Sequence, residues 1–125
     1  MTQWASIAGG GALGALLRYW VSTAVYGLLG RAFPWGTLAV NLIGSFLMGL
    51  LTVLLIERLE SAPETRAFLL IGFLGAFTTF STFSVETLLL IESGSWTRAL
   101  TNIAASVAVC VLAAFLGVTL GRGIG

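Results

Sequence analysis

The sequence predicts an all-α integral membrane protein with four transmembrane helices. Its 125 residues are 58% hydrophobic and 9% charged, whereas a soluble domain is about 45–50% apolar and 25% charged. Three charge-free stretches cover residues 32–56, 67–85 and 99–121, and each approaches or exceeds the roughly 18–20 residues that cross a hydrocarbon core as a helix. A fourth apolar stretch contains one arginine. We therefore expect spans at about residues 4–29, 35–56, 67–91 and 97–121.

The first span contains that arginine, Arg18. Because no basic residue precedes the apolar run and Arg18 interrupts it, we expect no cleavable signal peptide. An arginine at the bilayer centre costs about 2.5–3.5 kcal/mol. Arg18 could snorkel to the interface beside Tyr19 and Trp20, or attract anions into a vestibule. Four helices would use roughly 88 positions, so we expect residues 1–125 to form one transmembrane domain without an extramembrane part.

The second span begins after Phe33-Pro34 and carries Thr37 and Asn41 one helical turn apart. The amide donors of Asn41 would be costly to leave unpaired in hydrocarbon. They could form an interhelical hydrogen bond or donate to a permeating anion.

The third span is expected to open with a capping box, Ser61-Ala62-Pro63-Glu64, with proline in the first turn. It continues with two glycines followed by a run of Thr, Phe and Ser, which are poor helix formers. This predicts a break near Gly75 to Thr79, whose freed carbonyls would suit a hard cation such as Na⁺. The alternative is an unbroken helix whose hydroxyls bond back to its own backbone.

Beyond the predicted break, Phe80 and Phe83 share a helical face. Aromatic rings carry a positive edge that could meet a desolvated anion, although core packing is the commoner role. The surrounding hydroxyls favour the functional interpretation: Thr79, Ser81, Thr82 and Ser84. Glu86 lies one turn after Thr82 and is either a solvated interfacial carboxylate or part of a polar track.

The fourth span follows Ser93-Gly94-Ser95, which should end one helix and cap the next. Asn102, Ser106 and Cys110 recur every four residues along it. This stripe could join helices or line a path. Small residues spaced four apart predict close helix packing: Gly10 and Gly14, Ser45 and Gly49, and Ala113, Gly117 and Gly121.

Missing residue types exclude most enzymes. The chain has no Lys, Asp or His, so it lacks an imidazole base, a Schiff-base lysine and a His/Asp ligand set. Its single cysteine excludes disulfide scaffolds and thiolate metal clusters. A net charge of +1 without a basic cluster gives no indication of nucleic-acid binding.

The arginines are balanced between the two membrane sides. With four spans, the side of the termini carries Arg58, Arg66 and Arg122, and the other side carries Arg31 and Arg98. Three against two gives almost no topological bias. The chain could insert in both orientations and pair as an antiparallel homodimer, or adopt one weakly determined topology. Oligomers are expected in either case, since four short helices enclose little volume.

The chain resembles the Fluc (CrcB) family of bacterial fluoride channels over nearly its full length. The resemblance is carried by residues 11–19 (GALGALLRY), 36–44 (GTLAVNLIG) and 72–86 (GFLGAFTTFSTFSVE). It implies four-helix subunits that assemble as antiparallel, dual-topology homodimers with two fluoride pores and a structural Na⁺ at the centre. It further implies passive fluoride efflux across the bacterial cytoplasmic (inner) membrane, relieving fluoride toxicity.

The resemblance also implies site residues. Phe80 and Phe83 would offer ring edges to fluoride, Asn41 would donate its amide, and the carbonyls of Gly75 and Thr78 from both subunits would bind Na⁺. The remaining pathway residues would be Thr37, Ser81, Thr82, Ser106, Glu86 and, as vestibule electrostatics or packing, Arg18. The chain has Asn102 where some relatives carry a tyrosine, which puts a direct pore role of that position in doubt.

Two other classes compete with a channel. A small four-helix multidrug exchanger, also of dual topology, would need a carboxylate at mid-depth. The only glutamate inside a span is Glu86, near a boundary. A holin-like accessory protein would not need ordered polar stripes.

Overall fold

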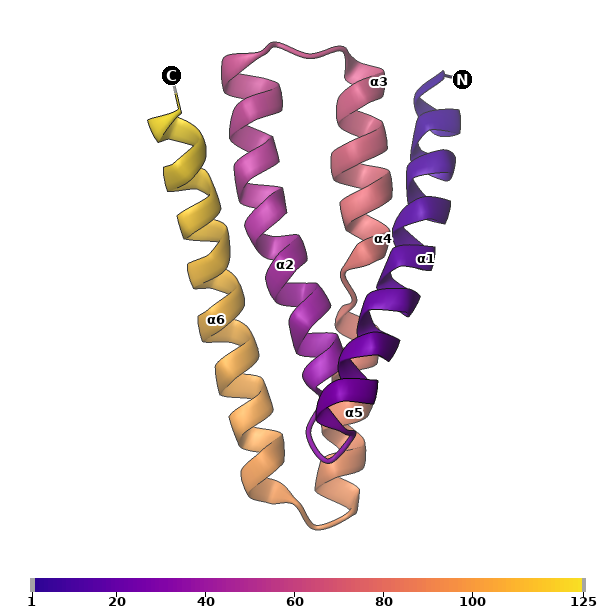
Figure 1. Cartoon of the computed structure of the whole chain (residues 1–125), viewed down its shortest axis with the longest axis vertical. Coiled ribbons are helices and arrows are strands. Elements are labelled where there is room, and N and C mark those ends of the chain that lie inside the picture. The colour runs from indigo at the N-terminus through magenta and orange to yellow at the C-terminus, as the bar shows by residue number, and fades with distance from the viewer. Residues whose placement is uncertain (1, 125) are drawn as a thin grey trace.

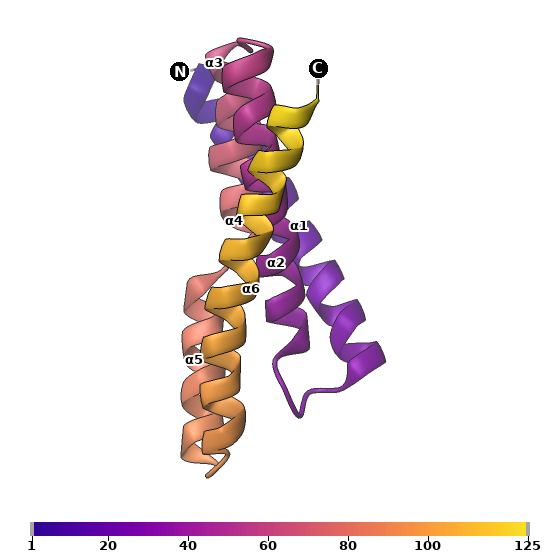
Figure 2. The same cartoon turned by 90° about the vertical axis from the view of Figure 1, so that its left-hand side faces the viewer.

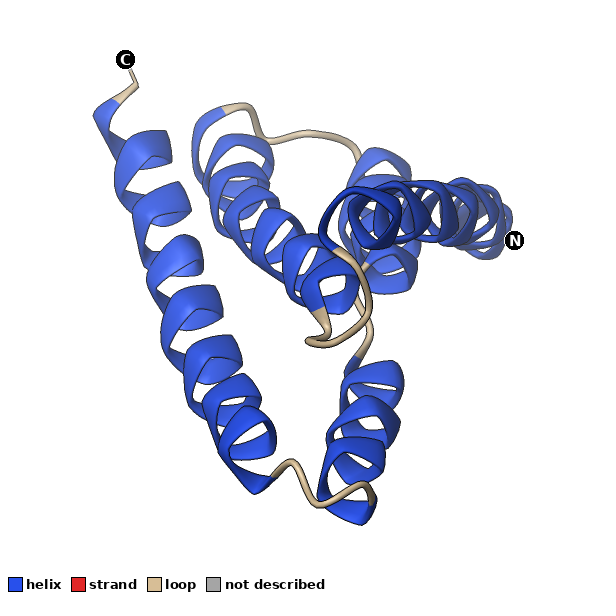
Figure 3. Cartoon of the chain, turned by 60° about the horizontal axis from the view of Figure 1, so that its bottom comes forward, coloured by secondary structure: helices blue, strands red, loops and turns tan. Residues whose placement is uncertain are grey.

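The computed structural model describes residues 2–124, which form helices joined by short loops (Figure 3). The α-helices are α1 (Thr2–Leu29), α2 (Trp35–Thr52), α3 (Pro63–Arg66), α4 (Gly75–Phe77), α5 (Phe80–Glu92) and α6 (Trp96–Gly123), and two π-helical segments are η1 (Val53–Arg58) and η2 (Ala67–Leu74). They make four candidate spans: Thr2–Leu29, Trp35–Arg58, Pro63–Glu92 and Trp96–Gly123. The predicted all-α class with four spans is confirmed.

Both ends of the described chain lie at the same end of the molecule (Figure 1), as an even number of spans requires. The first span packs along η2 and the second span packs along α6. At the opposite end α5 lies beside α6, while the lower parts of α1 and α2 diverge from that pair (Figure 2). The two halves of the third span therefore belong to different helix pairs.

Glycines at the helix crossings let backbones touch. A Cβ on Gly14 would lie 2.1 Å from the Phe73 carbonyl oxygen, and one on Gly10 would lie 2.2 Å from the Phe68 carbonyl oxygen. On the other side of the bundle, a Cβ on Gly117 would lie 2.2 Å from the Phe46 carbonyl oxygen. Such distances leave no room for any side chain, so the close packing predicted from small residues is confirmed.

The third span is broken where the sequence predicts a break. Helix α4 ends at Phe77, Thr78 and Thr79 are extended with φ/ψ of −90°/160° and −152°/119°, and α5 begins at Phe80. The alternative of an unbroken helix is wrong. Glycine and β-branched residues lower the helical propensity at this point, and side chains supply new acceptors for the N–H groups of Thr79 and Thr82.

The predicted capping box is wrong. The N-cap of the third span is Ala62, which makes no side-chain cap, although Pro63 does occupy the first helical position. Ser61 instead donates to the Leu55 carbonyl at 2.8 Å, because η1 ends nearby and leaves carbonyls to be satisfied. Similarly, Gly94 (φ 82°) follows the end of α5 as expected, but Ser95 makes no side-chain cap at the start of α6.

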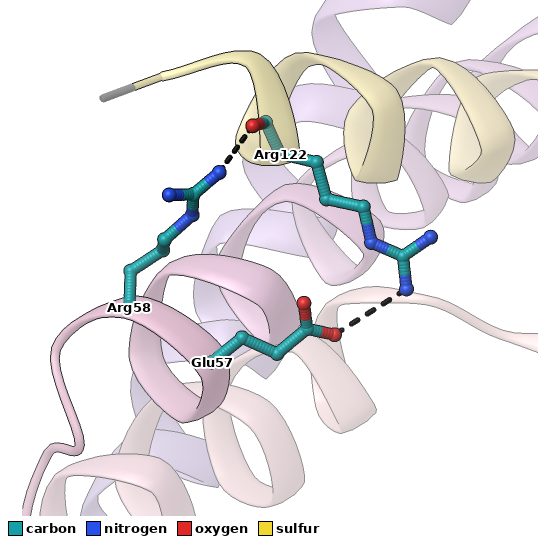
Figure 4. A network of polar contacts seen from close by, with 3 residues as sticks. All are labelled: Glu57, Arg58 and Arg122. Carbon is teal, nitrogen blue, oxygen red and sulfur yellow. Dashed lines mark hydrogen bonds and ion pairs between the residues drawn. The ribbon is translucent and has the colours of Figure 1, made fainter.

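An exposed polar cluster joins the ends of η1 and α6 beside the C-terminus (Figure 4). Arg122 forms an ion pair with Glu57 at 3.4 Å, and the Arg58 guanidinium donates to the Arg122 carbonyl. Exposed ion pairs contribute about 0–1 kcal/mol. The cluster therefore marks the polar end of the bundle more than it stabilises the fold.

The close crossing of α1 and η2 predicts opposite effects of one substitution at two glycines of α1. Gly14→Ala should lower the stability of the fold by roughly 1–3 kcal/mol, because the new methyl group meets backbone. Gly27→Ala is the matched control: nothing lies within 4 Å of its Cβ position, so it should be neutral or gain about 0.5–1 kcal/mol of helix propensity. Thermal denaturation in detergent measures both, and equal melting temperatures for the two variants would contradict the packing described.

Candidate ion pathway

A cavity of about 430 Å³ lies beside the break in the third span. Four segments line it: α2, the break itself, the start of α5 and the middle of α6. Its polar lining consists of Asn41, Ser45, Thr78, Thr79, Ser106 and Cys110, and the rest is apolar, including Phe80 and Phe83. The described lining is free of charged side chains. The polar groups that an ion entering this space would meet are therefore neutral: the Asn41 amide, hydroxyls and the Cys110 thiol.

The two phenylalanines lie together on this cavity, as their spacing predicts. Their ring centroids are 5.3 Å apart with the planes tilted by 40°. Phe80 is 78% exposed although it belongs to a membrane span. This chain thus leaves one face of the Phe80 ring uncovered at the depth of the break. The role of the ring edges in binding an anion stays a prediction.

Asn41 pairs with the backbone of the break through both ends of its amide. Its Oδ1 accepts the Thr79 N–H at 2.8 Å, and its Nδ2 donates to the Thr79 carbonyl at 3.0 Å. Both main-chain polar groups of Thr79 are therefore satisfied by one side chain. The structure thus confirms an interhelical hydrogen bond at Asn41. The amide nitrogen keeps a second hydrogen, because the bond to Thr79 uses only one.

The Thr79 side chain caps the second half of the span. Its Oγ1 accepts the Thr82 N–H at 3.1 Å and also contacts the Thr82 hydroxyl at 3.1 Å and the Ser81 hydroxyl at 3.4 Å. A hydroxyl that satisfies an N–H of the first turn is the usual N-cap arrangement. Ser81 and Thr82 thus belong to the cap of α5. Thr79 itself is an N-cap that the sequence analysis named only among the surrounding hydroxyls.

These bonds release two particular carbonyls. In a continuous α-helix each N–H donates to the carbonyl four residues earlier, so Thr79 would serve Gly75 and Thr82 would serve Thr78. Here the Thr79 N–H is held by Asn41 and the Thr82 N–H by the Thr79 hydroxyl. The carbonyls of Gly75 and Thr78 are thereby deprived of their helical donors.

Arg18 reaches the same break from the first span. Its Nε donates to the Ala76 carbonyl at 3.0 Å. The last carbonyls of a helix carry partial negative charge and favour a nearby cation. Arg18 therefore has a hydrogen-bond partner within the protein. Neither of the two predicted roles, snorkelling to the interface or attracting anions into a vestibule, included this bond. The vestibule role stays a prediction.

Glu86 lies in a second polar group towards the loop joining α1 and α2. Its two carboxylate oxygens accept hydrogen bonds from the Tyr26 hydroxyl at 2.7 Å and from the Thr37 hydroxyl at 2.5 Å. Arg31 places its guanidinium carbon 4.4 Å from the Tyr26 ring centroid, a cation–π contact. Tyr26, Arg31 and Glu86 also line a cavity of about 300 Å³. Glu86 is therefore tied to two other helices rather than simply solvated.

Tyr26 is a member of this group that its sequence context did not reveal. A buried tyrosine hydroxyl within an apolar span requires a partner, and Tyr26 is 8% exposed. From the sequence one could predict that the Tyr26 hydroxyl needs a hydrogen-bond partner. One could not predict that the partner is Glu86, because Glu86 lies on a different span.

The polar stripe of α6 divides between two roles. Asn102, 1% exposed, donates to the Thr87 hydroxyl at 2.9 Å and accepts from the Ser106 hydroxyl at 3.2 Å. It joins α6 to α5 and is not among the residues that line the larger cavity, whereas Ser106 and Cys110 are. The stripe therefore joins helices at one end and borders the cavity at the other.

Comparisons with known proteins consistently relate this chain to one family of membrane proteins. The family model described as "CrcB-like protein, Camphor Resistance (CrcB)" matches residues 5–118. Three relatives, each called "Fluoride-specific ion channel FluC", come from Magnetococcus marinus, Methylococcus capsulatus and Hydrogenovibrio crunogenus. The first is 60% identical over 96% of this chain and 98% of its own length.

The second relative is 56% identical over 94% of this chain, which spans about half (51%) of that relative, and the third is 50% identical over 90% of this chain and 86% of its own length. The family model overlaps all four spans and includes the break at residues 78–79 and the group around Glu86. The chain is a multi-pass protein of the bacterial inner membrane and belongs to the CrcB family.

Proposed function

We propose that this protein is a fluoride-selective channel through which cytoplasmic fluoride leaves the cell passively. The observation that carries the proposal is the uncharged cavity at the break, where Asn41, Phe80, Phe83 and Ser106 converge. Relatives that match most of the chain bear the name of a fluoride-specific channel. An enzyme and a multidrug exchanger have no comparable support.

The chemistry of the cavity suits a small, strongly hydrated anion. Weak partial charges can replace a hydration shell only through close contact with several groups. An amide N–H, hydroxyls and the positive edges of two rings provide such contacts without a formal positive charge that would trap the ion. Fluoride, as a hard hydrogen-bond acceptor, gains most from donors of this kind.

We further propose the order of the pathway along the chain. Ser106 and Asn41 offer donors on one side of the phenylalanine pair, with Arg18 supplying positive charge near the break. On the other side, the Ser81 and Thr82 hydroxyls lead towards Thr37 and Glu86. Thr37 and Asn41 lie one turn apart on α2, so a single helix connects the cavity to the Glu86 group.

The functional unit is proposed to be an antiparallel homodimer with two pores. Broken backbone at membrane depth is tolerated only where protein or a wet cavity covers it. In the single chain Gly75 and Phe80 are exposed at the break. A second copy crossing at this point would cover both. The nearly equal number of arginines on the two sides allows the copy to insert in the opposite orientation.

We propose that a structural Na⁺ lies where the two breaks meet, held by the main-chain carbonyls of Gly75 and Thr78 from both copies. Support comes from the hydrogen bonding: both carbonyls have lost their helical donors to Asn41 and to the Thr79 hydroxyl. Carbonyl oxygens of an unwound segment are suitable ligands for a hard cation. When bound, the ion would neutralise the partial charge of these oxygens and join the subunits.

Fluoride release from liposomes tests the function directly. Vesicles loaded with potassium fluoride and containing the purified protein should release fluoride down its gradient once valinomycin lets K⁺ leave with it, measured with a fluoride electrode, and should do so without a proton gradient. Chloride-loaded vesicles serve as the selectivity control. The channel would be refuted if no fluoride were released, or if release occurred only when an opposing proton gradient was imposed.

The ring pair can be tested with one matched control. Phe80→Ile or Phe83→Ile removes the ring edge while keeping an apolar side chain, and should slow fluoride release at least about ten-fold, since a ring-edge contact of about 1.4 kcal/mol is lost. Phe115→Ile changes a 63% exposed phenylalanine of α6 outside the cavity and should leave the rate unchanged. Wild-type rates in both cavity variants, with intact oligomers by size-exclusion chromatography, would contradict the ring-edge role.

Dual topology can be tested with reporter proteins fused to the C-terminus. C-terminal fusions to a reporter active only in the cytoplasm and to one active only in the periplasm should both give substantial signal, because the arginine bias is weak. Adding two arginines to the loop between α1 and α2 should bias both reporters towards one orientation. Strong signal in one compartment from the unmodified chain would exclude the antiparallel pair.

A further inference from the structure

Two polar side chains control which carbonyls of the break are free. Asn41 takes the Thr79 N–H, and the Thr79 hydroxyl takes the Thr82 N–H. Each of these N–H groups would otherwise close a helical bond, to Gly75 and to Thr78 respectively. The two released carbonyls are the two that the proposed cation site requires.

The arrangement also keeps Thr79 out of the helix. Asn41 bonds both the N–H and the carbonyl of Thr79, which satisfies its backbone as a neighbouring strand would. Without this pairing, the Thr79 N–H at membrane depth would lack a partner, because only its carbonyl, at the N-cap of α5, keeps a helical bond. An unpaired group there costs several kcal/mol, and the competing way to satisfy it is to rewind the helix through residues 78–79. That rewinding would consume the carbonyls of Gly75 and Thr78.

We infer that Asn41 and Thr79 are positioning residues for the cation site, so that an amide bordering the ion pathway sets the affinity of the protein for Na⁺. This inference rests on the proposed function. It assigns Asn41 a second task besides donating to the permeating anion. Asn41 borders the cavity and also holds the break, so the two proposed sites share one side chain.

A positioning role and a purely structural role predict different dependences of the melting temperature on Na⁺. A residue that merely stabilises the fold changes the melting temperature equally with and without Na⁺. A residue that prepares the carbonyls changes the Na⁺ concentration at which stabilisation occurs. The midpoint of that dependence is therefore the decisive quantity.

The experiment uses the purified full chain in detergent. Thermal unfolding and dimer content by size-exclusion chromatography are recorded against NaCl, with N-methylglucamine chloride holding the ionic strength constant. The wild type should be stabilised saturably by Na⁺. Thr79→Val, which keeps the shape but removes the capping oxygen, should raise the midpoint about ten-fold, equivalent to about 1.4 kcal/mol.

Three further variants complete the test. Thr79→Ser keeps the capping oxygen and should restore the midpoint to within about two-fold of the wild type. Asn41→Leu, which removes both bonds to Thr79, should raise the midpoint as Thr79→Val does. Thr101→Val changes an exposed threonine on α6 and is the matched control without effect. Should Thr79→Val not fold, Thr79→Ala carries the same expectation.

The possible results distinguish failure of the positioning role from failure of the proposed cation site. If Na⁺ stabilises the wild type but Thr79→Val and Asn41→Leu keep its midpoint, the positioning role is overturned while the cation site stands. If Na⁺ leaves the wild type unchanged, the cation site and this inference both fall, and fluoride release from liposomes still judges the channel independently. A raised midpoint in both variants, rescued by Thr79→Ser, supports the inference.

Discussion

The pairing of Asn41 with the backbone of Thr79 is the interaction on which the rest of the site depends. A helix interrupted within a membrane exposes N–H and carbonyl groups that cannot find water there. One amide side chain satisfies the N–H and the carbonyl of Thr79. Once Thr79 is extended, its hydroxyl is placed to cap α5. The direction of α5, and with it the position of the phenylalanine pair, follows from that cap.

The few polar residues of the spans are accordingly used to satisfy one another. Arg18 covers the Ala76 carbonyl, and Asn102 connects the Thr87 and Ser106 hydroxyls. The Glu86 carboxylate is shared by two hydroxyls from other spans. Arg18 and Glu86 therefore have partners that do not line the larger cavity. That cavity keeps neutral donors and apolar walls, which is the character a weakly held anion requires.

Sequence reasoning succeeded where the cause is local. Hydropathy fixes the four spans, and the run of glycine, threonine and phenylalanine weakens the helix at the residues where it breaks. Close packing at Gly14 and Gly117 was likewise predictable, since small residues four apart mark a helix face. The spacing of Phe80 and Phe83 was sufficient to place their rings together.

Prediction from the sequence failed or stayed ambiguous where the hydrogen-bond partner of a residue is distant in the sequence. Ser61 matches a capping box, yet the nearby end of η1 offers it the Leu55 carbonyl instead. Tyr26 gives no local sign of its bond to Glu86, 60 positions away. Asn41 could be seen to need a partner, but not that the partner is the backbone of Thr79.

The break in the third span is satisfied on one side and exposed on the other. Asn41, Thr79 and Arg18 satisfy the break from the side of their own subunit, while Gly75 and the Phe80 ring face outward. Lipid cannot satisfy a carbonyl, so an exposed main-chain carbonyl of the break requires protein or an ion. The proposed second copy would meet both needs, because its break would supply apolar cover for the rings and two further carbonyls to share a cation. In the proposed dimer, the interruption that borders the anion path would also form the contact between the two copies.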